Sequence, residues 1–490
     1  MRSFGPILLC VSLGLLCAAG GIRAVPIEID DADVTNFITT KLLADDAVDG
    51  HLIDVSTEDG VVTLSGSADN LLEKDKAAEL AGSVKGVRSV INRIDVTPWR
   101  RDDLEIYEDV VEALHTDPAT EAYELTVSVS DGVVTLGGEV DSWAEKVLSR
   151  RVVKSVRGVK AVEDAISVRA HPGKRPDAEI RADVLRSMET DVWIDASDVG
   201  VSVRDGRVKL TGTVGSAAEK SRAYLDAFVE GVGEVDDGAL RVDWGSYDPL
   251  ERDVKVPPDL SGEEIEEAIH DAFLRDPRVL AFSPEIEVDD GVVVLTGVVD
   301  NLAAKNAAEQ TALNTVGVWR VNNFLRVRPD NMPEDPVIAD RIRRALRRNP
   351  YTEPHEIEVS VRNGLVDLRG TVDSRFEMIE ASRAASKVSG VIEVDNHLVV
   401  RYGYELVEVK DDWELKDDVE AALWWSPYVP SEDITVTVDR GVVTLEGRVD
   451  TWNQRQRAKE TAEEAGARKV VNKLTVDLYG PDYYHEEQAP

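Results

Sequence analysis

Clustered basic side chains are the groups in this 490-residue sequence best suited to surface chemistry, although the formal net charge is −38. They gather in two predicted helices, one after residue 335 and one after residue 142. Lys and Arg beside an anionic lipid surface contribute about 1 kcal/mol each. The candidate membrane-contact residues are therefore Arg341, Arg344, Arg348, Lys146, Arg150 and Lys154. An exposed helix flank balanced by nearby acids is the alternative for either cluster.

Two adjacent tryptophans, Trp424 and Trp425, end a third predicted helix. Tryptophan is enriched at membrane–water interfaces, so the pair is a candidate for interfacial anchoring. Packing of at least one of the two rings in a core is the more ordinary use.

Known catalytic and metal-binding patterns are missing from the sequence. The seven histidines occur singly, and there is no HExxH motif, G-x-S-x-G elbow or P-loop. Acidic runs such as Glu263–Glu267 do not recur at a fixed place, which favours a solvated face, with diffuse binding of divalent cations left open. We expect no enzyme activity, and no catalytic, cofactor-binding or metal-binding residue.

The composition limits the partners further. Acidic residues number 94 against 56 basic ones, and this excess repels nucleic-acid phosphates, so no nucleic-acid partner is expected. Hydrophobic residues make up 43%, which is enough to build folded units.

The first 24 residues are typical of an export signal. Arg2 precedes an apolar run from Ile7 to Ala19, which is short for a membrane span and is followed by small residues. Both cysteines, Cys10 and Cys17, lie within it. We therefore expect a signal peptide at 1–24, whether cleaved or retained. We also expect a periplasmic or otherwise exported chain without disulfides, with membrane association as an alternative to free export.

The elements that hold these side chains are indicated by a repeat. A G-x-[VL]-x-L-x-G pattern occurs six times at intervals of about one small domain. Its paired glycines are Gly60 and Gly66, Gly132 and Gly138, Gly206 and Gly212, Gly291 and Gly297, Gly364 and Gly370, and Gly441 and Gly447. The first glycine usually follows Asp or Asn between alternating apolar residues, which predicts a β-hairpin with a type I′ turn. These glycines are interpreted as structural.

Each hairpin is flanked by the same predicted elements. An amphipathic helix precedes it, and a second helix begins after it at a capping pair such as Ser142 and Glu145. That helix ends near a glycine such as Gly158, and an alternating strand follows. The sequence thus predicts an α+β chain of tandem small domains, each helix-strand-strand-helix-strand with two helices on one face of a three-stranded sheet.

This order, with these glycines, resembles the BON domain, a family named for bacterial osmotically inducible and nodulation proteins. The resemblance covers six units, numbered 1 to 6 along the chain: 31–98, 103–170, 175–244, 261–329, 335–402 and 412–478. Unit 3 departs from the pattern at Arg207 and by an extra residue near Gly238, and unit 6 has Arg440 in its turn. The resemblance implies a non-catalytic protein of the bacterial envelope.

Proline-marked linkers separate several units, and 245–260 is the longest interruption, dividing a front trio from a rear trio. The acidic stretch 479–490 is expected to be an unpacked tail. We therefore expect a string of separate beads rather than one closed body.

Two functions remain for such a chain. The first is an envelope protein whose tandem units together bind phospholipid membranes or envelope surfaces, in osmotic or other envelope stress. The second is a scaffold or adaptor for other envelope proteins.

Overall fold

The structure is a computed structural model that describes residues 29–117, 120, 124–169, 175–243, 260–280, 282–329, 331–352, 356–401 and 410–476. The predicted signal peptide at 1–24 and tail at 479–490 lie outside these residues. So do most of the linkers, including 244–259.

Each of the six units has the predicted order of elements. Unit 2 shows it without interruption: α3 (Asp103–Thr116), β5 (Glu124–Ser130), β6 (Val133–Val140), α4 (Trp143–Lys154) and β7 (Ala161–Val168). The sheet order is β5-β6-β7, with the hairpin antiparallel and β7 parallel to β6. The mixed three-stranded sheet follows from the helix between the last two strands, because a parallel pair needs such a crossover. The predicted α+β class is confirmed.

The remaining elements repeat this plan. The first helices of the other units are α1 (Asp31–Ala44), α5 (Asp177–Glu189), α7 (Gly262–Arg275), α10 (Asp335–Arg348) and α12 (Asp412–Trp425). The hairpins are β1 (Ile53–Glu58) with β2 (Val61–Ala68), β8 (Val199–Arg204) with β9 (Arg207–Val214), β11 (Glu285–Asp289) with β12 (Val292–Thr296) and β13 (Val298–Val299), β16 (Ile357–Arg362) with β17 (Leu365–Val372), and β19 (Ile434–Asp439) with β20 (Val442–Val449).

The second helices and closing strands complete the units. The helices are α2 (Leu71–Gly82), α6 (Ala217–Asp226), α9 (Leu302–Leu313), α11 (Arg375–Ser386) and α13 (Trp452–Glu464). The strands are β3 (Ser89–Asn92) with β4 (Asp95–Val96), β10 (Glu234–Val242), β14 (Arg320–Asn323) with β15 (Arg326–Val327), β18 (Glu393–Val400) and β21 (Lys469–Val476). Short additional helices are η1 (Gly50–Leu52), η2 (Ala196–Asp198), α8 (Pro277–Leu280) and η4 (Ser431–Asp433).

The recurring glycines act in the backbone, as predicted. At the hairpin turn of unit 2, Asp131 has φ 51° and Gly132 has φ 78°, the positive pair that a type I′ turn requires. Arg440 takes the same conformation in unit 6, with φ 51°. In unit 3, the pairing of β10 with β9 shifts between Asp236 and Ala239, where the extra residue was expected.

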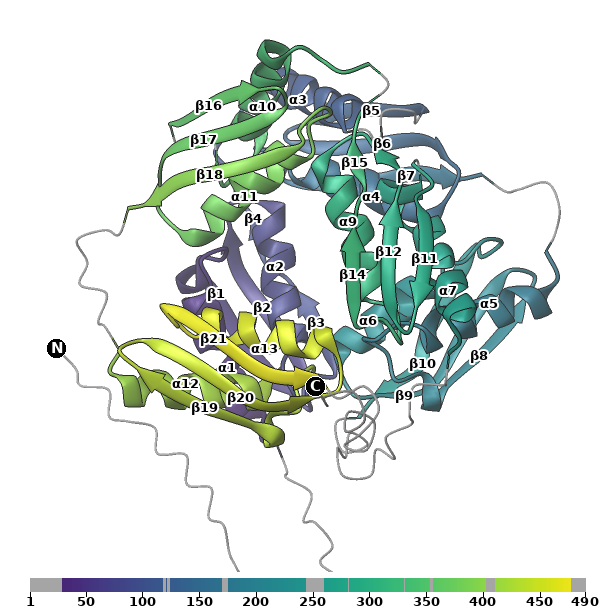
Figure 1. The fold of residues 1–490 in the computed structure, drawn as a ribbon, viewed down its shortest axis with the longest axis vertical. Helices are drawn as coiled ribbons and strands as arrows, with labels where there is room; N and C mark the ends of the chain where they lie inside the picture. Colours follow the sequence, from purple (N-terminus) through teal and green to yellow (C-terminus); the bar gives the residue numbers. More distant parts are fainter. Residues whose placement is uncertain are drawn as a thin grey trace, which may run out of the picture.

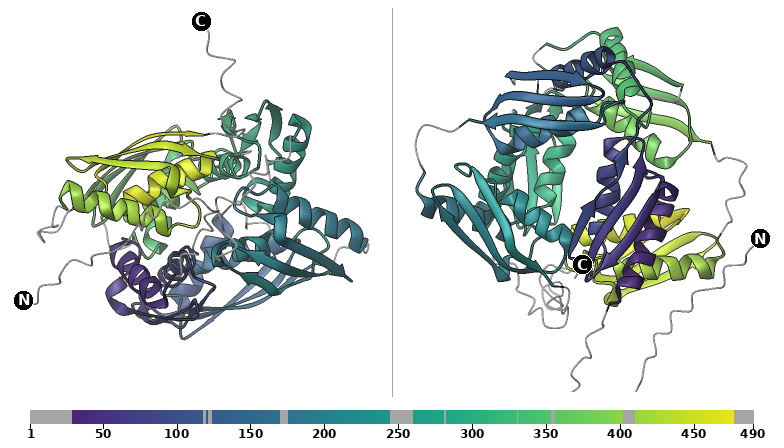
Figure 2. Two further views of the ribbon diagram at one scale, coloured as in Figure 1. Left: turned by 90° about the horizontal axis from the view of Figure 1, so that it is seen from below. Right: turned by 180° about the vertical axis from the view of Figure 1, so that it is seen from behind.

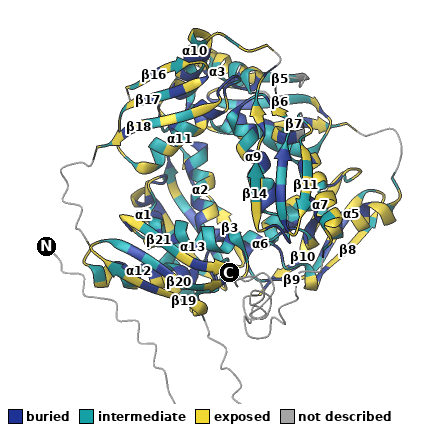
Figure 3. Cartoon of the chain, in the orientation of Figure 1, coloured by how far each residue is buried: buried dark blue, intermediate teal, exposed yellow. Residues whose placement is uncertain are grey.

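Each unit has its own apolar core between its helices and the inner face of its sheet. In unit 2 this core includes Ile106 and Val110 of α3, Leu136 of β6 and Val153 of α4. Buried residues alternate with half-buried or exposed ones along the strands, so the core lies on one face of each sheet (Figure 3). The units are therefore small domains with one-sided sheets.

The six units form two stacked rings of three (Figure 1, Figure 2). The first ring holds units 1, 2 and 3, and the second holds units 4, 5 and 6. In the first ring, the residue that begins each second helix packs on the next unit. Leu71 joins the core of unit 2, Trp143 stacks on Phe228 of unit 3 at 4.1 Å, and Ala217 joins the core of unit 1.

The second ring closes in the same way. Leu302 of unit 4 packs on the core of unit 5, and Arg375 of unit 5 pairs with Glu463 of unit 6 at 3.7 Å. Trp452 of unit 6 packs on the core of unit 4. Equivalent positions thus make equivalent contacts around both rings.

Backbone hydrogen bonds join the two rings at three equivalent places. In each, the amide before the glycine that lies four residues after a second helix donates to a carbonyl at the C-terminal end of a first helix in the other ring. The bonds are Lys85 N to Trp425 O at 3.0 Å, Arg157 N to Arg348 O at 2.8 Å and Val316 N to Thr190 O at 2.9 Å. They pair unit 1 with 6, unit 2 with 5 and unit 4 with 3.

The expectation of separate beads is therefore wrong. The helix ends of one unit contact another unit through apolar packing and hydrogen bonds, and these contacts close the chain into one body. The repeat pattern did not indicate these contacts, because it describes only features that lie inside each unit and recur in all six.

Candidate functional site

The basic residues of α10 lie where the two rings meet. Arg344 and Arg348 both pair with Glu112 of α3, at 2.7 and 3.3 Å. The Arg348 side chain is only 12% exposed, and its burial lowers the guanidinium pKa. Arg341 is partly exposed and makes no ion pair within the described residues.

Three basic residues of α4 also have partners. Lys146 donates to the carbonyl oxygen of Ile166 at 2.6 Å and pairs with Asp164 at 3.2 Å. Arg150 also pairs with Asp164, at 3.7 Å, and Lys154 pairs with Asp75 of unit 1 at 2.5 Å. These contacts hold the last strand of unit 2 and join two units of the first ring.

The repeat explains the contact of Lys146. Lys74 and Lys220 occupy the same position in units 1 and 3, and each donates to the equivalent carbonyl of its closing strand, at 2.6 and 2.8 Å. A side chain with a recurring internal partner has a structural role. Membrane contact by the six candidate residues stays a prediction, and five of them are held in ion pairs.

The tryptophan pair joins units 1 and 6 instead of facing a membrane. Trp425 is 8% exposed and stacks on Phe37 at 4.9 Å between ring centroids. The ammonium group of Lys85 lies 5.3 Å from the centroid of the Trp424 ring, and burial lowers the Lys85 pKa to about 8. Packing of at least one of the two rings in a core is therefore confirmed for Trp425, and the Trp424 ring packs against the same core.

Two other tryptophans are far more exposed. Trp99, in the segment that follows unit 1, is 84% exposed, and Trp413, at the start of α12, is 74% exposed. Neither belongs to a doublet or to the repeated pattern, so no signal in the sequence indicated that these two rings are exposed.

Within the described residues, no group of three or more histidine, cysteine or carboxylate side chains is arranged to hold a metal ion. In the same part of the chain, no helix is both long and apolar enough to cross a bilayer.

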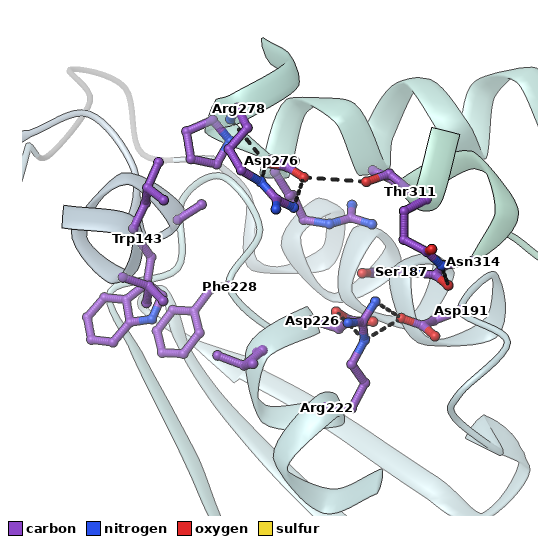
Figure 4. Close-up of a pocket in the computed structure, with 18 of the residues that line it drawn as sticks. Trp143, Ser187, Asp191, Arg222, Asp226, Phe228, Asp276, Arg278, Thr311 and Asn314 are labelled. Atoms are coloured by element: carbon purple, nitrogen blue, oxygen red, sulfur yellow. Dashed lines mark hydrogen bonds and ion pairs between the residues drawn. The ribbon is translucent and has the colours of Figure 1, made fainter. Parts of the chain in front are cut away.

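A cavity of about 280 Å³ lies where units 2, 3 and 4 meet (Figure 4). Unit 2 contributes one side of α4, from Trp143 in its first turn to Arg151 in its last turn. Unit 3 contributes side chains from α5 and α6, and unit 4 contributes the end of α7 and part of α9. Thus the rings must assemble before this cavity exists.

An ionic cluster forms one wall of the cavity. Arg222 contacts Asp191 at 2.6 Å and Asp226 at 3.7 Å. Burial, and after it the neighbouring Asp191 carboxylate, raises the pKa of Asp226 well above its usual range. At the opposite wall, Arg278 pairs with Asp276 at 2.6 Å.

The structure thus defines a class of protein: a tandem-repeat α+β chain whose copies of one small domain pack into a single body. Matches to the BON domain model cover residues 30–98, 102–170, 176–243, 261–329, 334–402 and 411–477. The chain belongs to the BON domain family, with six tandem domains.

Among curated proteins, the chain is similar to osmotically-inducible protein Y of Escherichia coli (strain K12). They are 28% identical over 148 residues, which is 29% of this chain and 74% of that protein. This is a distant relationship.

Two solved structures also match, both of CdsD, a structural protein of the type III secretion system of Chlamydia trachomatis. The C-terminal domain is 14% identical, with 44% of this chain and 100% of that chain covered, and a TM-score of 0.12. The other is 14% identical, with 42% and 91% covered, and a TM-score of 0.12. At these values the likeness carries no conclusion about this chain.

Proposed function

We propose that this BON-domain protein is a non-catalytic, exported protein of the cell envelope that binds phospholipid membranes or envelope surfaces, in osmotic or other envelope stress. The proposal is supported by the six BON domains, by the similarity to an osmotically inducible protein and by the export-type first 24 residues.

One observation carries the proposal: the closed body holds six copies of one domain at fixed positions, each with a solvent-facing sheet surface. Weak contacts on a rigid body combine, because the first contact brings the others to a high effective concentration. Rigid spacing also avoids the entropy cost of ordering flexible linkers on binding.

The exposed aromatic rings, more than the basic helices, are suited to touch a membrane. Trp99 and Trp413 present their rings to solvent, whereas Arg348 and Lys154 are held in contacts between units. Because the net charge is −38, approach to an anionic bilayer requires screening or bridging by divalent cations.

Sedimentation with phosphatidylglycerol vesicles tests the proposal. We expect the mature protein to pellet with vesicles at low salt, and more strongly with Mg²⁺. Replacing both rings, Trp99→Ala with Trp413→Ala, should lower the bound fraction several-fold, since each removes an amphipathic ring suited to the interface. Leu43→Ala, which truncates another exposed apolar side chain, is the control and should leave binding unchanged.

A scaffold for envelope proteins is the second candidate, and the open sheet edges favour it. In unit 5 the order β16-β17-β18 leaves β16 and β18 at the edges, and an unpaired edge can add a strand from a partner. Absence of vesicle binding, with and without Mg²⁺, would reject the membrane proposal and leave the scaffold.

A further inference from the structure

The cavity between units 2, 3 and 4 contains polar residues where the repeat otherwise prefers apolar or small ones. The units can be aligned at a residue just past the end of the first helix. In the five units whose next two residues the structure describes, the side-chain oxygen of this residue accepts a hydrogen bond from the backbone amide two positions later. These oxygens belong to Asp45, Asp191, Asp276, Asn349 and Ser426. Four residues earlier unit 3 has Ser187, whereas the other units have Lys41, Ala113, Ala272, Ala345 and Ala422.

Asp226 departs from the repeat in the second helix. It lies ten residues after the N-cap Ser216, and the other units have Leu80, Val152, Thr311, Ala384 and Thr461 there. A buried carboxyl group and a buried hydroxyl both cost free energy unless they gain partners. Their occurrence together in one cavity indicates a use beyond packing.

Several donors in the cavity wall are unsatisfied. The Ser187 hydroxyl is buried, the residue being 3% exposed, and it has no hydrogen-bond partner. The same is true of the buried indole nitrogen of Trp143. In Figure 4, Ser187 lies between the Asp276–Arg278 pair and the cluster of Arg222, Asp191 and Asp226.

Two guanidinium groups of the wall also lack a fixed partner. Arg151 of α4 and Arg275 of α7 line the cavity, and within the described residues neither side chain forms a hydrogen bond or an ion pair, although the charge of Arg275 acts on the Asp226 carboxyl group. Arg222 and Arg278, in contrast, are already paired. The cavity therefore keeps two positive charges available in a chain that is strongly acidic elsewhere.

We propose that this cavity binds the phosphate group of a small solute, with Arg151 and Arg275 as its charge partners and Ser187 as a hydrogen-bond donor. Two free guanidinium groups match the charge of one phosphate dianion, and arginine pairs with phosphate oxygens through parallel N–H bonds. The volume of about 280 Å³ admits a small molecule only. Burial raises the pKa of Asp226, which favours the neutral form of this carboxyl group over a wider pH range.

Titration calorimetry of the full mature chain with inorganic phosphate tests this site. We expect saturable binding at one site per chain. Arg275→Ala should weaken it by about tenfold or more, because a charge-assisted hydrogen bond is lost. Ser187→Ala installs the residue that four other units carry, so the fold should persist while binding weakens. Arg347→Ala removes an exposed arginine of α10 outside the cavity and should leave binding unchanged.

Each of several outcomes would overturn the proposal. They are no saturable phosphate binding by the unmodified chain, an equal loss in Arg347→Ala and Arg275→Ala, and equally tight binding of succinate, which would show that the cavity does not select phosphate. If Ser187→Ala lowered vesicle binding but not phosphate binding, the cavity would bind a lipid headgroup. That result would also reject a small solute as its ligand. Vesicle binding itself is measured separately, so the two proposals can fail independently.

Discussion

A single carboxyl group, that of Asp226, distinguishes unit 3 from the other five at a buried helix position. The other units place Leu, Val, Ala or Thr there, consistent with packing. Asp226 instead lies beside Asp191 and Arg222, and its pKa is raised. A sequence alignment of the six units against one another would have revealed it, because a charged residue interrupts an otherwise apolar or small position.

This carboxyl group predicts a pH effect on stability. Above the ordinary pKa of 3.8 the unfolded chain releases the proton, whereas the folded chain keeps it to higher pH. Folding therefore binds a proton, so the contribution of this group to stability falls as pH rises from 3.8 toward the raised folded pKa. Asp226→Asn should raise the thermal unfolding midpoint relative to the unmodified protein, increasingly as the pH rises above 4, as calorimetry would measure.

Asp54→Asn provides the control, since it removes a carboxylate from an exposed strand position. The raised pKa would be contradicted if the unfolding midpoint of Asp226→Asn differed from that of the unmodified protein by the same amount at every pH.

At the scale of elements, an aspartate ties the first helix to the hairpin turn. In unit 1, Asp31 accepts from the backbone amides of Asp59 and Gly60, at 2.7 and 2.9 Å. The same pair of bonds is formed by Asp103, Asp177, Asp335 and Asp412. Unit 4 has Gly262 there and lacks the side chain. The contact joins residues 28 and 29 positions apart, which explains why local patterns did not predict it.

Removal of this contact should loosen the turn without unfolding the chain. Asp31→Ala leaves two turn amides without their acceptor, and the cost of local opening is about 1–2 kcal/mol for two such bonds. We expect faster hydrogen exchange at the amides of Asp59 and Gly60, measured by mass spectrometry. Asp33→Ala removes an exposed carboxylate from the same helical turn; similar exchange in both variants would show that charge, rather than the two bonds, sets the protection.

At the scale of the whole molecule, the segment at 244–259 joins two rings that already hold each other. The rings share the three equivalent backbone hydrogen bonds and the ion pairs of Glu112 with Arg344 and Arg348. These contacts are spread over all six units, so the covalent connection adds effective concentration more than specificity.

We therefore expect residues 25–243 and 260–490, coexpressed as two chains, to copurify as a one-to-one complex. Glu112→Ala should weaken the complex, because it leaves two arginines at the ring contact without their carboxylate. Glu108→Ala, an exposed carboxylate on the same helix, serves as the control. Two trios that migrate separately in size-exclusion chromatography would contradict the two-ring body.

The sequence by itself determined the fold of each unit. Hairpin turns, helix caps, C-terminal glycines and alternating strands are set by residues a few positions apart, such as Ser142 with Glu145, and their sixfold recurrence made the family resemblance specific. The sequence also located two departures from the pattern, Arg440 in a turn and an extra residue near Gly238, and the structure has a positive φ at the first and a register shift at the second.

The way in which the units meet is visible only in the folded structure. The same holds for the roles of the basic and tryptophan side chains that the sequence offers as membrane contacts. Arg348, Lys154 and Trp425 have no distinguishing local pattern, because their partners lie in other units. The cavity with Ser187 and Asp226 likewise exists only once three units are brought together. The physical reason is that contacts between units depend on shape and charge over distant segments, whereas the repeat pattern reports the periodicity that each unit needs for its own core.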